Sequence, residues 1–249
     1  MTAAAVATST RQLGLPAAIR ACLFDLDGVL TRTAHVHAAA WKATFDDFLR
    51  KRAGATGEPF VGFDPVLDYR TYVDGMSRYD GVRRFLTSRR IELATEDVVA
   101  LADAKNELVL QVLGTRGVRA YEGSLRYVRA ARAAGLRTAV VSASANCREV
   151  LLAAGLDDLF DVRIDGVVAA RKHLPGKPAP DTFLAAARAL ALPPAAAAVF
   201  EDALAGVAAG RRGGFGFVVG IDRLGQAEAL RRHGADLVVA DLAELLEET

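Results

Sequence analysis

Short apolar runs alternate with helical patterns over most of this chain. The apolar runs predict strands at residues 21–24, 137–142, 161–164, 196–200, 215–219 and 237–239. Apolar positions at helical spacing predict helices at residues 124–134, 148–154, 182–190 and 203–210, and a last helix from about residue 242. Strands and helices that alternate in this way are typical of a parallel sheet with helices on both faces.

Residues 33–113 interrupt this alternation, because they contain helical patterns and no convincing strand. Trp41, Phe45 and Phe48 recur at helical spacing within the first of these patterns. The interruption directly follows the first predicted strand. We therefore predict an α/β parallel-sheet core made of residues 17–32 and 114–249, with an inserted α-helical cap of residues 33–113 and a flexible leader of residues 1–16.

Composition narrows the classes of function. Lys and Arg total 31 against 30 Asp and Glu, and a net charge of +1 argues against binding of nucleic acid through bulk electrostatics. No apolar run approaches the ~20 residues of a membrane span, and the first residues lack the pattern of a signal peptide. Cys22 and Cys147 have no metal-ligand spacing and are expected as reduced core residues. We therefore expect a cytoplasmic protein.

Two aspartates follow the first predicted strand, which reads ACLF. Asp25 and Asp27 stand at its carboxyl end, where open α/β sheets bind ligands, and Gly28 allows the chain to turn sharply. Two carboxylates so close together favour a divalent cation with oxygen ligands between them. A surface turn with two solvated acids is the alternative, and this segment alone does not decide between them.

Three further polar groups stand at or beside later strand ends. The Ser142 hydroxyl follows the run TAVV and would form an anion cradle with the N–H groups of the next helix, although by itself it suits an N-cap better. Lys177 lies in the stiff segment GKPAPD and would pin a phosphate, unless it is an ordinary exposed loop lysine. Glu201 and Asp202 close a buried strand, which costs desolvation unless a cation compensates them, and Asp202 would also serve as an N-cap.

These four groups, in this order, resemble the haloacid dehalogenase superfamily of phosphotransferases. The resemblance extends from residue 21 to about residue 241 and implies a Rossmann-like (HAD-like) core with a mobile cap. It implies that Asp25 is the nucleophile that becomes an aspartyl phosphate and that Asp27 is the general acid and base. It also implies a phosphate site that is formed by Ser142, Ala143, Asn146 and Lys177. It further implies a Mg²⁺ site that is formed by Asp25, Asp27 with its backbone carbonyl, Glu201 and Asp202.

Longer stretches narrow the resemblance to the β-phosphoglucomutase-like subfamily. They read DLDGVLTRTAHVHAAAWK, DGMSR, LADAKN, VSASAN and GKPAPD. The resemblance implies that the cap closes over the substrate. The substrate-binding residues that it implies are Thr33, His37, Trp41, Gly75, Ser77, Arg78, Lys105 and Ser144.

Three of these residues also have structural explanations. Lys105 falls on the apolar stripe of its predicted helix, where an ammonium needs an acid, a carbonyl or a ligand phosphate unless it extends to the edge of the stripe. His37 lies one turn before Trp41, and a lone histidine on an apolar face is usually a satisfied core residue. Arg78 would grip a second phosphate through two hydrogen bonds, or it is a surface charge that opens the next helix.

The chain departs from the subfamily pattern at Arg32 and Ala203. Where the subfamily commonly has an aspartate between two threonines, this chain has Thr31-Arg32-Thr33, and Ala203 replaces the more usual serine. Neither residue belongs to the catalytic set. Arg32 lies in the first of two predicted linkers, at residues 31–33 and 115–121, and leaves the exact sugar preference open.

The resemblance implies a Mg²⁺-dependent phosphomutase that interconverts β-D-glucose 1-phosphate and β-D-glucose 6-phosphate through an aspartyl phosphate and a bisphosphate. Arg78, Lys105 and His37 favour this activity, because they suit a ligand with a phosphate at each end. A sugar-phosphate phosphatase on the same scaffold is the alternative, and a catalytically silent sugar-phosphate-binding protein is a third hypothesis. We expect a small sugar phosphate as the partner, no nucleic acid, no membrane and a monomeric chain.

Replacing Asp25 by asparagine should remove the chemistry with little effect on folding, because an amide cannot form an aspartyl phosphate. We expect Asp25→Asn to fold and never to become phosphorylated, as measured by phosphate incorporation into the purified protein. An active Asp25→Asn variant would refute the assignment of Asp25 as the nucleophile.

Overall fold

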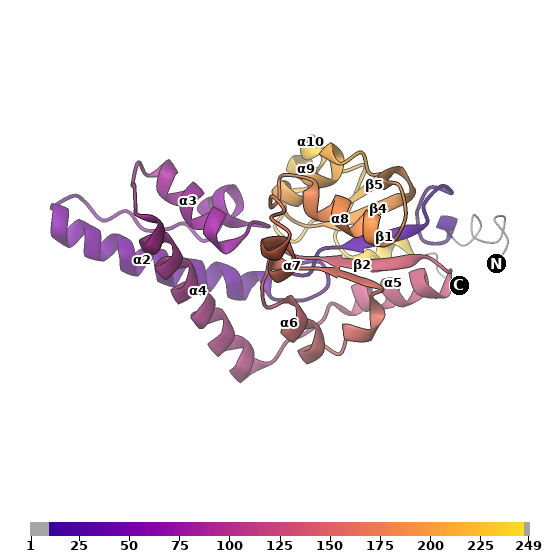
Figure 1. The fold of residues 1–249 in the computed structure, drawn as a ribbon, viewed down its shortest axis with the longest axis horizontal. Coiled ribbons are helices and arrows are strands. Elements are labelled where there is room, and N and C mark those ends of the chain that lie inside the picture. Colours follow the sequence, from indigo (N-terminus) through magenta and orange to yellow (C-terminus); the bar gives the residue numbers. More distant parts are fainter. Residues whose placement is uncertain (1–9, 247–249) are drawn as a thin grey trace. The chain divides into compact units, whose positions relative to one another are not determined.

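The computed structural model describes residues 10–246, which form two compact units. One unit contains the chain up to Arg32 and again from Val118, and the other contains Thr33–Gly117. The first is an α/β unit and the second is helical (Figure 1). The predicted fold class, a parallel α/β core with a helical insertion, is confirmed. Across residues 10–246, no helix has both the length and the apolar character that crossing a membrane requires.

Six parallel strands form the sheet of the described α/β unit, in the order β3-β2-β1-β4-β5-β6. They are β1 (Ala21–Phe24), β2 (Arg137–Val141), β3 (Val162–Ile164), β4 (Ala197–Glu201), β5 (Phe217–Ile221) and β6 (Leu237–Val239). The strand β1 lies between β2 and β4, and the register aligns Phe24 with Val140 and Phe200. Because parallel strands end at one edge of the sheet, the residues that follow β1, β2 and β4 lie side by side.

Helices occupy the connections between these strands. They are α5 (Glu122–Ala133), α6 (Cys147–Ala153), α7 (Gly166–Arg171), α8 (Asp181–Ala189), α9 (Leu204–Arg212) and α10 (Ala227–His233), with 3-10 turns at Asp157–Leu159, Pro194–Ala196 and Leu242–Leu245. The apolar pattern predicts neither α7 nor α10, which have only six and seven residues. The helix predicted from residue 242 is wrong for the described residues, which form a 3-10 turn capped by Asp241.

Helices cover both faces of the sheet (Figure 1), and successive side chains of a strand point to opposite faces. The Tyr127 ring of α5 lies 6.3 Å from the ring of Phe24 and 5.3 Å from that of Phe200. On the other face, Phe183 of α8 packs in one buried cluster with Leu23. Since successive strand residues point to opposite faces, burial of both faces explains why the central strands are continuous apolar runs.

The helical unit contains its own aromatic core. Its elements are α2 (Ala34–Thr56), a π-helix (Tyr69–Val73), α3 (Arg78–Ser88) and α4 (Thr95–Arg116). Phe45 is fully buried, with the rings of Trp41, Phe63 and Phe85 centred 4.9, 5.2 and 4.2 Å from its own. A unit with a separate hydrophobic core has the anatomy of a domain.

Residues 10–16 are packed against the α/β unit, and the predicted flexible leader of residues 1–16 is wrong for this part. Leu13 and Leu15 are buried, and the Tyr127 hydroxyl donates a hydrogen bond of 2.8 Å to the Leu13 carbonyl. These two leucines show no helical or strand period, so the sequence gives no local signal of their burial. Residues 1–9 lie outside the described residues.

Asp46 joins α2 to the segment that follows it. Its carboxylate accepts hydrogen bonds from Lys42 Nζ at 2.6 Å and from the Phe63 N–H at 2.8 Å. Burial raises the pKa of Asp46, but these hydrogen bonds and the charges of Lys42 and Arg50 outweigh burial, so the pKa is lowered overall. The folded helical unit therefore favours the ionised form of Asp46.

Replacing Asp46 by asparagine should lower the free energy of unfolding at pH 7 by about 1–3 kcal/mol, because buried donors lose a charged acceptor. Since folding lowers the pKa of Asp46, its stabilisation is present above about pH 4 and is lost as the pH falls through the folded-state value. Urea unfolding of Asp46→Asn and the wild type at pH 7 and about pH 3 should show that the difference shrinks in acid.

Asp47→Asn is the matched control, because Asp47 is exposed and pairs with Lys51 at 2.7 Å. We expect a change of less than about 1 kcal/mol for this surface pair. Equal losses in the two variants at pH 7 would contradict the role assigned to Asp46.

Candidate active site

One buried ammonium joins the carboxylates at the ends of β1 and β4. Lys177 Nζ donates to Asp25 Oδ1 at 2.5 Å and to Glu201 Oε1 at 2.6 Å. It also donates to the carbonyl of Val141, the last residue of β2, at 3.2 Å. A single side chain thus ties together the ends of three neighbouring strands.

Lys177 reaches this position from the loop between α7 and α8. Only 2% of its side chain is exposed, so the alternative of an ordinary exposed loop lysine does not hold. Its Nζ also lies 5.0 Å from the centre of the Phe183 ring. The following segment is held by Arg212, whose Nη1 donates to the Pro178 carbonyl at 3.1 Å, and the Lys177–Pro178 peptide is cis.

Burial sets the electrostatics of this group. Burial raises the pKa of Asp25, the Glu201 and Asp27 carboxylates raise it further, and Lys177 opposes them. Burial alone would lower the pKa of Lys177, but its contacts with Asp25 and Glu201 outweigh burial and raise it. Lys177 therefore stays protonated, and the ionised form of Asp25 depends on positive charge beside it.

Two glycines let the acidic side chains approach the backbone. Gly28 has a φ of +90°, and a Cβ placed on it would lie 1.8 Å from Asp202 Oδ2. A Cβ on Gly206 would lie 1.7 Å from Glu201 Oε1. Glu201 is fully buried, and its Oε2 accepts a hydrogen bond from the Ala203 N–H at 2.9 Å. Side chains at these two positions would displace carboxylates that the protein holds from several sides.

The segment after β2 forms a tight hydroxyl-rich turn. Ser142 is buried, and its Oγ accepts from the Ser144 N–H at 3.0 Å, while Ser144 Oγ accepts from the Asn146 N–H at 3.1 Å. Asn146 is the N-cap of α6, so the Ser142 hydroxyl does not occupy the capping position that its alternative interpretation requires. Ala143 lies within this turn, next to Gly166 of α7.

The donor set at these strand ends fits a hard divalent cation. Asp25 and Glu201 are buried beside one ammonium, and the buried Asp202 carboxylate lies next to Gly28, which leaves an excess of carboxylate oxygen. Within residues 10–246 there is no cluster of three or more Asp, Glu, His or Cys side chains that would bind a metal ion on its own. Mg²⁺ commonly binds through one or two carboxylates and keeps several waters, so this arrangement is compatible with it.

In the helical unit, the predicted substrate residues of α2 and α4 gather around Lys105. This buried ammonium donates to His37 Nδ1 at 2.7 Å and lies 4.8 Å from the centre of the Trp41 ring. Thr33, the residue before α2, is buried as well. The structure therefore places Lys105 inside the helical unit, and the alternative of a lysine that extends to the surface does not hold.

The remaining predicted substrate residues surround the start of α3. Arg78 Nη2 lies 3.2 Å from Asp103 Oδ1, and the guanidinium lies 4.7 Å from the centre of the Tyr79 ring. The Ser77 hydroxyl caps α3 by accepting from the Asp80 N–H, and Gly75 has a φ of +71°. Arg78 is thus oriented by two neighbours and is neither a free surface charge nor fully buried.

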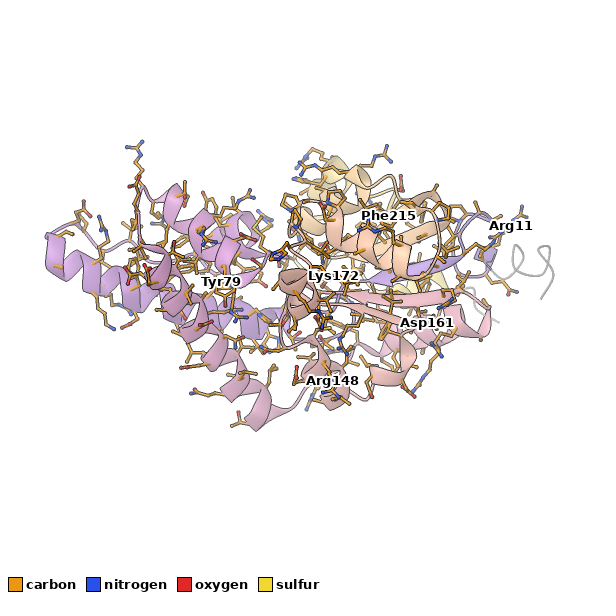
Figure 2. All side chains as sticks on the ribbon, viewed as in Figure 1. Arg11, Tyr79, Arg148, Asp161, Lys172 and Phe215 are labelled. Carbon is orange, nitrogen blue, oxygen red and sulfur yellow. The ribbon has the colours of Figure 1, made fainter. Side chains whose placement is uncertain are left out.

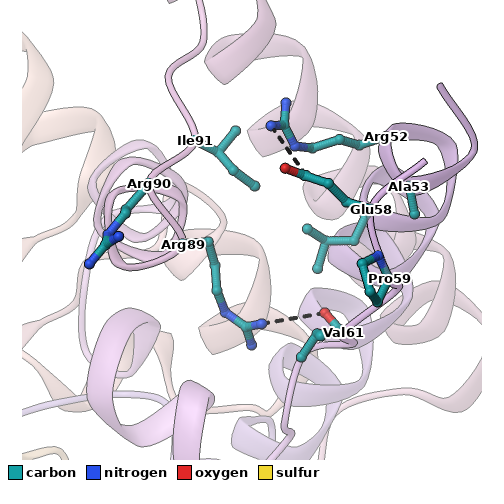
Figure 3. Close-up of a pocket in the computed structure, with 9 residues that line it drawn as sticks. Arg52, Ala53, Glu58, Pro59, Val61, Arg89, Arg90 and Ile91 are labelled. Carbon is teal, nitrogen blue, oxygen red and sulfur yellow. Dashed lines mark hydrogen bonds and ion pairs between the residues drawn. The ribbon is translucent and has the colours of Figure 1, made fainter. Parts of the chain in front are cut away.

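A cavity of about 310 Å³ opens elsewhere in the helical unit (Figure 3). Arg52 faces Glu58 at 3.6 Å, and Arg89 donates to the Val61 carbonyl at 3.4 Å. Arg89 also pairs with Asp68 at 2.8 Å. These two guanidinium groups are therefore engaged within the protein, and none of the predicted site residues lines this cavity.

Sequence reasoning missed two side chains that support the acidic loops. Gln226 Nε2 donates to the Asp202 carbonyl at 3.0 Å, and Arg223 Nε donates to the Gly28 carbonyl at 2.8 Å. Both residues lie in the segment between β5 and α10, far along the chain from Gly28. No motif marks them, because each acts through a backbone atom of a distant residue.

The amino-acid sequence is similar to those of known proteins. The family model of haloacid dehalogenase-like hydrolases matches residues 19–214. The chain is 57% identical to the β-phosphoglucomutase of Mycobacterium bovis over 249 residues, which covers 95% of this chain and 95% of that protein.

Solved structures agree with this result. The crystal structure of β-phosphoglucomutase from Clostridium difficile matches with a TM-score of 0.74 and 28% identity over 91% of this chain and 93% of that chain. CbbY from Rhodobacter sphaeroides, in complex with xylulose-1,5-bisphosphate, matches with a TM-score of 0.69 and 26% identity over 91% of this chain and 96% of that chain. These similarities confirm the resemblance that the motifs predict.

Replacing Lys177 by methionine should destabilise the protein, because Asp25 and Glu201 lose their shared buried cation. Leaving buried charges uncompensated costs about 3–5 kcal/mol. Urea unfolding at pH 7 measures the loss. Lys172→Met is the control, because Lys172 lies exposed at the end of α7 (Figure 2) and should change little. A Lys177→Met variant as stable as this control would contradict the role of Lys177.

Proposed function

Because the chain belongs to the haloacid dehalogenase-like hydrolase family and is an enzyme of its β-phosphoglucomutase-like subfamily, we propose that it interconverts β-D-glucose 1-phosphate and β-D-glucose 6-phosphate with Mg²⁺. The observation that carries the proposal is the buried ammonium of Lys177 between Asp25 and Glu201. Phosphoryl transfer depends mainly on positioning and on neutralising charge, which is what this group provides.

We assign Asp25 as the nucleophile. Lys177 holds one oxygen of Asp25 at 2.5 Å, which restricts the carboxylate to one orientation and leaves the second oxygen for attack on phosphorus. When the bisphosphate reacts, a bond forms between that oxygen and phosphorus, and the bond from phosphorus to the sugar oxygen breaks. In the reverse direction, phosphorylated Asp25 donates to a sugar hydroxyl. The two half-reactions regenerate phosphorylated Asp25 at the end of each cycle.

Asp27 is the proton donor and acceptor in this proposal. It lies two residues after Asp25 and is only partly buried, so its carboxyl group has access to a ligand. It would take the proton from the attacking sugar hydroxyl and return it to the leaving sugar oxygen. A hydrogen bond of 2.8 Å from the Gly28 N–H to the Thr31 carbonyl closes the loop that follows Asp27.

Mg²⁺, when bound, would supply positive charge that reduces the repulsion between Asp25 and an incoming phosphate. We assign Asp25, Asp202 and the backbone carbonyl of Asp27 to hold it. Both oxygens of Glu201 already accept hydrogen bonds, from Lys177 and from the Ala203 N–H. We therefore infer that Glu201 supports the site indirectly, by fixing the position of Lys177. The turn of Ser142, Ala143 and Asn146 and the Lys177 ammonium would hold the transferring phosphoryl group.

The helical unit would recognise the rest of the substrate. Lys105 and His37 present nitrogen donors beside the Trp41 ring, and Arg78 presents a guanidinium oriented by Asp103. Groups of this kind bind a second phosphate and a sugar ring. We therefore assign sugar recognition to Thr33, His37, Trp41, Gly75, Ser77, Arg78 and Lys105, together with Ser144 of the α/β unit.

We also propose a monomeric cytoplasmic enzyme with a small sugar phosphate as its partner. The net charge of +1 gives no support for a polyanionic partner. The two cysteines, Cys22 and Cys147, are buried free thiols, which suits a reducing compartment.

A phosphatase acting on a sugar phosphate is the second candidate. The same aspartyl phosphate would be hydrolysed wherever water reaches it, so the chemistry of Asp25 does not separate the two activities. CbbY, which shares this fold at 26% identity, has been crystallised with xylulose-1,5-bisphosphate, a different sugar bisphosphate. Because a related protein binds another sugar bisphosphate, we assign no particular sugar to this second candidate.

Incubation of the protein with β-D-glucose 1-phosphate, Mg²⁺ and a trace of β-D-glucose 1,6-bisphosphate should yield β-D-glucose 6-phosphate. The bisphosphate supplies the first phosphoryl group to Asp25, which then turns over many substrate molecules. Coupled oxidation of glucose 6-phosphate measures the mutase, and release of inorganic phosphate measures the phosphatase. We expect product to exceed free phosphate by at least about tenfold, because a phosphomutase must transfer faster than it hydrolyses.

Two controls make this assay decisive. Chelation of Mg²⁺ by EDTA and the Asp25→Asn variant should each abolish both products. Release of phosphate without glucose 6-phosphate would support the phosphatase instead. A protein that forms neither product from a panel of sugar phosphates would argue against both assignments.

A further inference from the structure

Arg223, which follows β5, contacts three separate segments of the α/β unit. Its Nε donates to the Gly28 carbonyl at 2.8 Å, and its Nη1 donates to the Ala240 carbonyl at 2.7 Å. Its guanidinium carbon lies 3.6 Å from the centre of the Tyr121 ring. Its Nη1 also lies 3.4 Å from Asp241 Oδ2, and only 14% of the Arg223 side chain is exposed.

The first of these segments is the loop that carries Asp27. Gly28 directly follows Asp27, its N–H donates to the Thr31 carbonyl, and its α-carbon lies against the Asp202 carboxylate. Arg223 holds the remaining polar group of this residue, the Gly28 carbonyl. Both backbone polar groups of Gly28, the residue after Asp27, are therefore hydrogen-bonded.

The second segment is one of the two linkers that lead to the helical unit. The linkers pair with each other, because the Arg32 N–H donates to the Arg119 carbonyl at 2.8 Å and the Tyr121 N–H donates to the Leu30 carbonyl at 2.9 Å. Thr31 also forms a bridge with Ala120. The ring of Tyr121 thus brings the paired linkers against Arg223.

Arg32, the departure from the subfamily pattern, takes part in the same group. Its guanidinium carbon lies 5.0 Å from the centre of the Tyr121 ring, and the residue is exposed. Water weakens the attraction between an exposed cation and an aromatic ring. Arg32 is therefore an outer contact of Tyr121, whereas Arg223 also bonds to the loop of Asp27.

The side chain of Arg223 carries one energetically unfavourable group. Its Nη2 is buried and has no hydrogen-bond partner within residues 10–246. An unpaired buried donor is unfavourable, and a smaller side chain would avoid it. Its other contacts are with Gly28, Ala240, Asp241 and Tyr121, and bonding to the first three while stacking on the Tyr121 ring needs the planar fork of an arginine.

We propose that Arg223 is a positioning residue that couples the paired linkers to the loop carrying Asp27. The inference rests on the proposed function, in which Asp27 moves the proton and the helical unit binds the sugar. A general acid must lie within about 2.6–3.2 Å of its proton acceptor, and a displacement of about 1 Å costs on the order of a hundredfold in rate. By gripping both segments, Arg223 makes the position of Asp27 depend on the linkers.

The test compares Arg223→Gln and Arg223→Lys with Arg232→Gln. Arg232 lies exposed on α10 and pairs with Glu228 at 3.4 Å, so its substitution makes the same chemical change on the surface. Hydrogen exchange is followed in residues 26–31, where the N–H groups of Gly28, Leu30 and Thr31 are hydrogen-bonded within the loop. Exchange in β2 serves as the internal reference.

We expect Arg223→Gln to accelerate exchange in residues 26–31 at least tenfold, with β2 unchanged. In the assay above, kcat should fall about 10- to 100-fold with KM within about threefold, because the proton transfer is misplaced while sugar contacts remain. Arg223→Lys, which keeps a donor and a charge, should restore part of both, and Arg232→Gln should match the wild type.

Unchanged exchange in residues 26–31 of Arg223→Gln, or a kcat equal to that of Arg232→Gln, would overturn the proposal. If Arg223→Gln does not fold, Arg223→Lys decides by the same two criteria. If the wild type converts no sugar phosphate, the proposed function fails, and the exchange measurement still decides whether Arg223 couples the loop to the linkers.

Discussion

The structure of the candidate site depends on one ion triplet, the ammonium of Lys177 between the carboxylates of Asp25 and Glu201. Burying a single carboxylate is unfavourable, and burying two side by side is worse, so the two carboxylates are buried together because a cation lies between them. With both carboxylates ionised, the triplet carries a net negative charge. A further cation, or a ligand phosphate carried in with one, completes the balance, and this incompleteness makes the group suitable for catalysis rather than only for stability.

The sheet supplies the geometry that the triplet requires. Because β1 lies between β2 and β4, the residues after these strands form a row without any long loop to position them. Gly28 and Gly206 then remove the two side chains that would keep Asp202 and Glu201 apart from the backbone. The strand order and the two glycines thus allow the acidic side chains to approach each other. The ammonium of Lys177 offsets the cost of burying Asp25 and Glu201.

Much of this was predictable, because the strongest signals are local. Continuous apolar runs identify the buried strands, and a polar residue directly after such a run marks the reactive edge of the sheet. Lys177 was identified by its motif, but its contacts with Asp25 and Glu201 depend on tertiary structure. The apolar pattern does not predict short elements such as α7, and the buried leucines before β1 have no period. The sequence gives no signal for the contact of Arg223 with Gly28, because Arg223 binds a backbone carbonyl that any residue would present.

Chemistry and recognition are assigned to two units with separate cores, and this separation has a consequence for the substrate. The aromatic cluster around Phe45 and the contact of Lys105 with His37 are formed entirely within the helical unit. In the proposed function, substitutions there would change the sugar that is bound without disturbing the triplet of Asp25, Lys177 and Glu201. A related fold crystallised with a different sugar bisphosphate is what such independence predicts. In the proposed function, the α/β unit therefore performs phosphoryl transfer, and side chains of α2, α3 and α4 select the sugar.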